Sequence, residues 1–199
     1  MTLYLLRHGQ TSANRGGLLQ GHVDLDLTEL GRTQAAAAAH AFRQRDVSRI
    51  VSSPLRRAVQ TAEIVARNLG LDFTVDARLV EIDYGLWDER ALAEISDSDW
   101  AQWRSDADFA PPNGESLRSV SERAAAFAEA TLATDGNSIA VSHVSPIKAV
   151  VAWSLGGDVA TTWRMHLDLA SISAVGIRAS RPFLASYNEV AGFADSGAQ

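Results

Sequence analysis

A nucleophilic side chain and an anion-binding side chain are neighbours near the N-terminus, in the run Leu6-Arg7-His8-Gly9-Gln10-Thr11. The apolar residues before this run predict a buried strand that feeds a tight loop. Open α/β sheets place their chemistry at the carboxyl ends of strands, where this imidazole and guanidinium would lie. A short basic motif also fits an exposed loop without function. The rest of the chain must therefore supply partners for it.

The first candidate partner is an arginine that follows the apolar run 50–53. Pro54 is predicted to open a helix at its first position, where a missing N–H is harmless. The next residues include Arg56 and Arg57, in the first turn, where free N–H groups and the helix dipole also favour anions. Paired arginines are usually a solvated face, but Arg57 has a role available in a site.

A carboxylate comes next, in Glu81-Ile82-Asp83-Tyr84-Gly85-Leu86-Trp87. Apolar and aromatic neighbours can raise the pKa of such a group until it serves as a general acid. A second histidine, His143, ends the apolar run 138–142, and a helix begins at once. Its ring and nearby backbone N–H groups can face one anion. All four motifs are expected at the same edge of the sheet. It is therefore a poor explanation that each of them has only a structural role of its own.

Strands and helices alternate along the chain, which predicts how these residues are positioned. Short apolar runs indicate strands at 3–6, 50–53, 71–75, 138–142, 171–178 and 183–187. Helical patterns occupy 28–45, 54–69, 116–133 and 146–155. Between them, 14–22 is a flexible glycine-rich connection, a turn at 180–182 joins the last two strands, and 192–199 is expected to fray. The prediction is one α/β domain over 1–199, a three-layer α-β-α sandwich with a mostly parallel central sheet and an antiparallel edge.

The irregular segment 77–114, with short helices around 91–95 and 98–104, predicts a small cap-like insertion over the active site at about 86–115. Its aromatic residues could line a substrate cavity or pack into a core of their own, and we favour packing. They are Trp87, Trp100, Trp103 and Phe109.

Composition narrows the class of protein. The 199 residues are 46% hydrophobic and 21% charged, which is ordinary for a soluble globular domain. A net charge of −6 argues against nucleic-acid binding, and no apolar stretch could span a membrane. No cysteine is present, which excludes disulfides and thiolate chemistry. Without a signal-like segment, the cytoplasm is the expected location. The oligomeric state is left open.

Together these motifs resemble the histidine phosphatase superfamily, the phosphoglycerate-mutase-like clan, over nearly the whole chain. The Arg-His-Gly motif corresponds to Arg7-His8-Gly9, followed by Thr11 and Asn14. The turn before a Leu-Thr-x-x-Gly signature corresponds to Gln20-Gly21 and to Leu27-Thr28-Glu29-Leu30-Gly31. The Ser-Pro-Leu-x-Arg-Ala arginine is Arg57, the acid is Glu81 and the second histidine is His143.

One departure concerns the residue after the second histidine, which is usually glycine and here is Val144. Valine offers a backbone N–H but resists a positive φ, so its contact to phosphate is the least secure correspondence. The expected phosphate and substrate ligands are Thr11, Asn14, Gln20, Gly21, Tyr84 and Val144.

The resemblance implies a metal-free mechanism without a cofactor. Neutral His8, oriented through its far nitrogen, attacks phosphorus and forms a phosphohistidine. Three groups hold the phosphoryl oxygens, namely Arg7, Arg57 and His143 as imidazolium. Glu81 protonates the leaving oxygen and then activates the hydrolytic water.

The expected activity is hydrolysis of a small phosphorylated metabolite. A phosphoglycerate mutase is the alternative, but the basic residues expected of one are scattered here, at Arg90, Arg104, Arg118 and Arg123, among many acidic residues. A catalytically silent phospho-ligand-binding protein is less favoured, because a binder need not keep nucleophile and acid together. The tryptophan-rich insertion suggests, weakly, a substrate with a bulky or uncharged portion.

Overall fold

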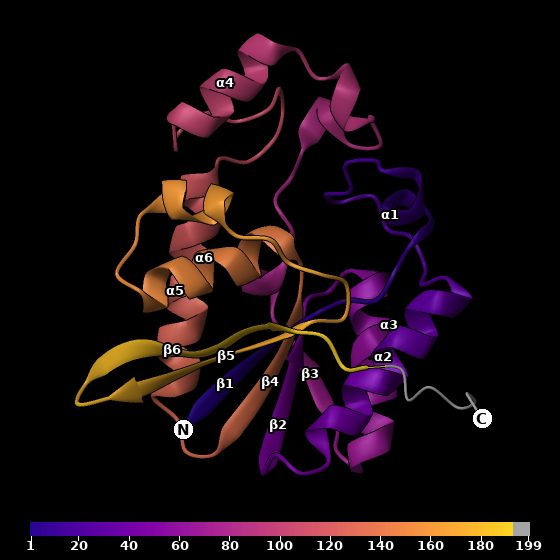
Figure 1. The fold of residues 1–199 in the computed structure, drawn as a ribbon, viewed down its shortest axis with the longest axis vertical. Coiled ribbons are helices and arrows are strands. Elements are labelled where there is room, and N and C mark those ends of the chain that lie inside the picture. Colours follow the sequence, from indigo (N-terminus) through magenta and orange to yellow (C-terminus); the bar gives the residue numbers. More distant parts are fainter. Residues whose placement is uncertain (193–199) are drawn as a thin grey trace.

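A computed structural model describes residues 1–192, and most of the segment expected to fray, 193–199, lies outside them. Within that range a single sheet has the strand order β3-β2-β4-β1-β5-β6 (Figure 1). The strands are β1 (Thr2–Arg7), β2 (Val47–Ser52), β3 (Phe73–Val75), β4 (Asn137–Ser142), β5 (Ile172–Arg178) and β6 (Arg181–Glu189). β1 to β4 are mutually parallel, whereas β5 pairs antiparallel with both β1 and β6. The predicted mostly parallel sheet with an antiparallel edge is confirmed.

Helices cover both faces of the sheet (Figure 1). The α-helices are α1 (Ser12–Gly16), α2 (Glu29–Phe42), α3 (Arg56–Leu69), α4 (Asp97–Ser105), α5 (Leu117–Leu132) and α6 (Val144–Ser154). Short 3-10 turns are η1 (Ala77–Leu79), η2 (Gly85–Trp87), η3 (Leu92–Glu94) and η4 (Val159–Arg164).

Alternate residues of the strands build two separate cores. Leu3 and Leu5 of β1 pack with α5 and α6, whereas Leu6 packs with α2 and α3. This two-residue alternation is what a strand buried on both faces produces, because successive side chains point to opposite faces. The three-layer arrangement predicted from the sequence is therefore confirmed.

Several predicted boundaries shift for local reasons. The helix expected to open with Pro54 begins at Arg56, after Leu55. The helix expected from 146 begins at Val144, because Pro146 fits its first turn, where no N–H partner is needed. The last turn consists of Ala179 and Ser180, both at positive φ, so 181–182 already belong to β6.

One helix was missed by the sequence analysis. α1 (Ser12–Gly16), whose N-cap is Thr11, overlaps the connection that was expected to be flexible at 14–22. Asn14 completes a capping box with Thr11, a threonine and a polar residue three positions apart, which is a readable signal for a helix start.

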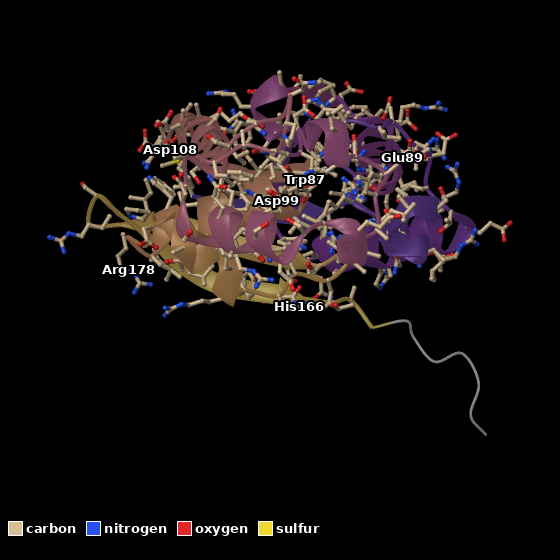
Figure 2. All side chains as sticks on the ribbon, turned by 90° about the horizontal axis from the view of Figure 1, so that it is seen from above. Trp87, Glu89, Asp99, Asp108, His166 and Arg178 are labelled. Atoms are coloured by element: carbon tan, nitrogen blue, oxygen red, sulfur yellow. The ribbon has the colours of Figure 1, made fainter. Side chains whose placement is uncertain are left out.

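The segment 86–115 lies above the carboxyl ends of the strands (Figure 1), and its apolar side chains share a third hydrophobic core with Leu19, Ile82 and residues of α5. Trp87 and Trp103 are 3% exposed and meet edge to face, with ring centroids 5.7 Å apart. Figure 2, seen from above, shows Trp87 and Asp99 in the middle of this upper surface, with Glu89 and Asp108 toward its two sides. The tryptophans therefore pack against one another, as favoured above, and Trp87, Trp100 and Trp103 do not line the cavity that contains His8.

Candidate active site

Parallel register brings the key loops together at one edge of the sheet. Arg7 at the end of β1 lies beside Ser142 of β4, and Ser52 of β2 lies beside Val141. Backbone bonds extend this pairing beyond the strands, since the N–H of His8 donates to the Ser142 carbonyl at 3.0 Å. The rings of His8 and His143 consequently approach to 5.0 Å between centroids.

Close backbone packing fixes the loop that carries His8. A Cβ on Gly9 would lie 2.2 Å from the carbonyl oxygen of Gly31, at the start of α2. Thr28, the N-cap of α2, donates its N–H to the Gln10 carbonyl at 2.8 Å. The Leu-Thr-x-x-Gly signature therefore acts as a backbone platform under the loop.

The His8 ring is oriented for attack through Nε2. Its Nδ1 lies 2.7 Å from the Gly9 carbonyl oxygen, which can only accept, so Nδ1 carries the proton. Nε2 is then left with a lone pair. Burial, reinforced by the charges of Arg57 and Arg7, holds the His8 pKa well below its ordinary value. The ring is a neutral nucleophile, as the mechanism requires.

His143 and Arg57 form a buried layer beneath His8. Nε of Arg57 donates to Nδ1 of His143 at 3.2 Å, and Nε2 of His143 faces the Ser53 hydroxyl at 2.7 Å. Arginine cannot accept a proton, so His143 accepts at Nδ1 and is neutral. Burial and then Arg57 also lower the His143 pKa well below its ordinary value. The expectation that His143 is an imidazolium is therefore wrong for this structure.

Arg57 is caged by main-chain oxygens of the loop before α2. Its guanidinium donates to the carbonyls of Gly21 at 2.8 Å and Val23 at 3.1 Å, and it is fully buried. Arg56 instead points to the surface and pairs with Asp26. Arg57 was the arginine favoured for the site, and its burial distinguishes it from the surface-exposed Arg56.

The same loop is fastened to the cap by Asp88, which the sequence analysis did not identify. The Asp88 carboxylate accepts three successive backbone N–H groups, from Gly21 at 2.7 Å and from His22 and Val23 at 2.9 Å each. Consecutive N–H groups of this kind form an anion-binding nest. Because the Gly21 N–H is bound to Asp88, it does not line the cavity.

Glu81 is buried and lies at the N-terminus of α6, a contact that the sequence analysis did not identify. Its carboxylate accepts N–H bonds from Ile82 at 2.8 Å, Val144 at 3.0 Å and Ser145 at 3.1 Å. Val144 has no positive φ, so valine is unstrained there. The residue after His143 thus binds the catalytic candidate Glu81 through its N–H.

The main chain at Glu81 is held from two sides. Arg123 of α5 donates to the carbonyls of Val80 at 2.6 Å and Glu81 at 3.3 Å, and it pairs with Glu115. The His22 ring lies 3.0 Å from the same Glu81 carbonyl. A contact this distant in sequence carries no local signal, which is why Arg123 was not identified as part of the site.

A cavity of about 420 Å³ opens over His8. Seven of the eleven residues proposed from the sequence line it: Arg7, His8, Asn14, Gln20, Glu81, Tyr84 and Val144. Thr11, Gly21, Arg57 and His143 do not line it and lie behind its wall. Burial raises the pKa of the Tyr84 phenol, so this group stays a hydrogen-bond donor in the wall.

The cavity also has a wall that the sequence analysis missed, formed by the residues before β5. His166, Leu167, Asp168 and Leu169 line it, and the Leu167 carbonyl accepts from Arg7 at 2.6 Å. Nε of Arg7 is buried and has no hydrogen-bond partner among residues 1–192.

Over 1–192 no cluster of three or more histidine, aspartate or glutamate side chains could hold a metal ion. No helix in this range is long and apolar enough to cross a membrane.

The fold and this site define an α/β protein with two buried histidines and a buried arginine at the carboxyl edge of its parallel strands. The chain belongs to the histidine phosphatase superfamily (branch 1), whose family model matches residues 3–190. The resemblance inferred from the sequence motifs is confirmed.

Individual relatives lie at moderate identity. The chain is 38% identical over 177 residues to the bifunctional protein Rv2228c of Mycobacterium tuberculosis, covering 86% of this chain and 49% of that protein. It therefore spans about half the length of the first curated relatives that it matches.

Solved structures match over nearly the whole chain. A mycobacterial glucosyl-3-phosphoglycerate phosphatase in complex with VO3 has a TM-score of 0.87 and 35% identity, covering 94% of this chain and 98% of the other. A phosphoserine phosphatase mutant from Entamoeba histolytica in complex with phosphoserine has a TM-score of 0.88 and 27% identity, covering 95% and 97%.

Proposed function

We propose that the protein is a metal-independent phosphomonoesterase that hydrolyses a small phosphorylated metabolite through a phosphohistidine. The observation that carries this proposal is the Nδ1 contact of His8 to the Gly9 carbonyl, which leaves Nε2 free beside Arg7 and Glu81 in one cavity. The family and the phosphatases among its relatives support the same class.

The proposed reaction has two steps. Nε2 of His8 attacks phosphorus, the bond to the leaving oxygen breaks, and a protonated Glu81 donates its proton to that oxygen. Glu81, now a carboxylate, takes a proton from water, which attacks phosphorus and breaks the P–N bond. The positive charge of Arg7 and of the buried Arg57 stabilises the charge on the equatorial oxygens. Direct contact of Arg57, His143, Thr11 or Gly21 with phosphate stays a prediction.

The mutase alternative has less support, because the scattered basic residues are occupied elsewhere. Arg118 pairs with Asp108, Arg104 lies over the Trp100 ring, and Arg90 donates to the Glu94 carbonyl. Arg123 holds the Glu81 main chain, as described above. A silent phospho-ligand-binding protein would also need no preformed nucleophile.

The proposal is tested with p-nitrophenyl phosphate in the presence of EDTA. We expect hydrolysis at an unchanged rate after chelation, and its loss in His8→Ala. Loss of the wild-type activity on chelation would overturn the metal-free mechanism. Location in the cytoplasm stays a prediction from the sequence.

A further inference from the structure

We propose that the substrate is a phosphate ester of an uncharged alcohol with an apolar body, and that Asp168 selects against alcohols that carry a carboxylate. The inference rests on the proposed phosphatase function and concerns the half of the cavity that does not hold phosphate. It uses residues for which the sequence analysis assigned no role.

Apart from Arg7, His8 and Glu81, the cavity lining contains more apolar than polar side chains; the polar ones are Asn14, Gln20, Tyr84, His166 and Asp168. Five leucines from three separate segments line the cavity: Leu18, Leu19, Leu92, Leu167 and Leu169. Leu18 and Leu19 pair with the cap through an isolated bridge and a 2.9 Å backbone bond to Arg90. Leu92, in η3 of the segment 86–115, is 50% exposed to solvent. An exposed leucine at the mouth of a leucine-lined cavity gains by contact with an apolar ligand.

The cavity lining offers few cationic side chains that a carboxylate of the substrate could pair with. Among the described residues that line the cavity, Arg7 is the only lysine or arginine, and with His8 it serves the phosphoryl group. His166 is the remaining group able to carry positive charge, and its Nε2 lies 3.0 Å from Oδ1 of Asp168. A carboxylate on the substrate would meet no unpaired cation there.

Asp168 is held in place as a fixed anion. The Asn188 side chain accepts the Asp168 N–H at 2.8 Å and donates to Oδ2 of Asp168 at 2.8 Å. Asn188 has a positive φ and lies in β6 where the register between β5 and β6 shifts. This irregularity of the edge strand places the Asn188 side chain against both the N–H and the carboxylate of Asp168. Hydrogen bonds from His166 and then Asn188 lower the Asp168 pKa, which keeps it ionised. This carboxylate, which pairs with His166 and is 47% exposed, repels a second carboxylate and accepts hydrogen bonds from hydroxyl groups.

The test compares kcat/KM for three primary alkyl phosphates: n-butyl phosphate, glycerol 3-phosphate and 3-phosphoglycerate. The last two differ only in replacing a hydroxymethyl group by a carboxylate. We expect n-butyl phosphate to be the best substrate and glycerol 3-phosphate to exceed 3-phosphoglycerate by about tenfold, the scale of one charge contact. Equal or better turnover of 3-phosphoglycerate overturns the inference.

Two variants test the cause. Asp168→Asn should narrow the ratio of glycerol 3-phosphate to 3-phosphoglycerate to about threefold or less, and Leu92→Lys, at an exposed position, should raise relative turnover of 3-phosphoglycerate about tenfold. Glu129→Gln removes one exposed charge far from the cavity and should leave the ratio unchanged. If it changes the ratio as much as Asp168→Asn, the net charge of −6 and not Asp168 causes the discrimination.

The same ligands separate this inference from the proposed function. Titration of His8→Ala with n-butyl phosphate and 3-phosphoglycerate by calorimetry measures selectivity without turnover. Absence of hydrolysis of every phosphate ester overturns the proposed function, whereas the order of the two binding constants still decides which ligand class the cavity takes.

Discussion

Asp88 fastens the cap to the loop that cages Arg57, and Asp88→Asn should weaken both stability and catalysis. An asparagine retains one acceptor oxygen and places an NH2 group where the other oxygen accepted an N–H. At least one of the three charge-assisted bonds, from Gly21, His22 and Val23, is replaced by two donors facing each other. The remaining bonds lose the charge of their acceptor.

The magnitude follows from these bonds. Hydrogen bonds to a charged partner contribute about 1.5–3 kcal/mol each, and water can replace part of this at the exposed His22. We therefore expect the free energy of unfolding to fall by about 2 kcal/mol. Because the Gly21 and Val23 carbonyls position Arg57, kcat/KM for p-nitrophenyl phosphate should fall at least tenfold.

Urea unfolding and steady-state kinetics measure the two effects. Asp26→Asn is the matched control, since it removes an acidic residue of the same loop that pairs only at the surface with Arg56 and Gln60. It should change stability by about 0.5 kcal/mol or less. An Asp88→Asn protein as stable and active as the wild type would refute the role of this nest.

Three further predictions concern pH, Arg123 and Glu81. The pKa values of buried His8 and His143 lie well below 6.5, so the unfolded chain binds more protons than the folded chain below that pH. The free energy of unfolding should therefore fall on acidification, by up to about 1.4 kcal/mol per pH unit for each histidine. Urea unfolding between pH 7.5 and 5 would measure this fall. Arg123→Met should lower kcat more than it raises KM, whereas Arg123→Lys should restore part of kcat. Glu81→Ala should slow alkyl phosphates at least tenfold more than p-nitrophenyl phosphate, because only the poor leaving group needs the proton.

Contrary results are equally specific. Stability that is flat or rises on acidification would mean that the two histidines take up protons in the folded state. A change in KM alone for Arg123→Met would assign that residue to substrate binding and not to positioning Glu81. Equal losses for both kinds of leaving group would remove Glu81 as the general acid.

The sheet and the motif residues could be predicted because their signals are local. Apolar runs that end at Arg7, Ser52 and Ser142 indicate strands, and the helices between them indicate that these strands are parallel and end at one edge. His8, Arg57 and Glu81 follow from motifs a few residues long. The predicted three-layer fold is confirmed on this basis.

The parts that escaped prediction depend on contacts between distant segments. Asp88 acts on a loop more than sixty residues away, and Asn188 reaches Asp168 across a strand irregularity. The prediction that His143 is an imidazolium was also wrong, because the charge of this ring depends on which of its nitrogens faces Arg57. Neither residue spacing nor local composition records these partners.

The central claim is that His8 accepts the phosphoryl group at Nε2. Rapid alkaline quenching during turnover of p-nitrophenyl phosphate, followed by peptide mass spectrometry and phosphorus NMR, identifies both the modified residue and the ring nitrogen. We predict phosphate on His8 at Nε2, because Nδ1 is bound to the Gly9 carbonyl. Phosphate at Nδ1, phosphate on another residue, or full turnover by His8→Ala would contradict the account.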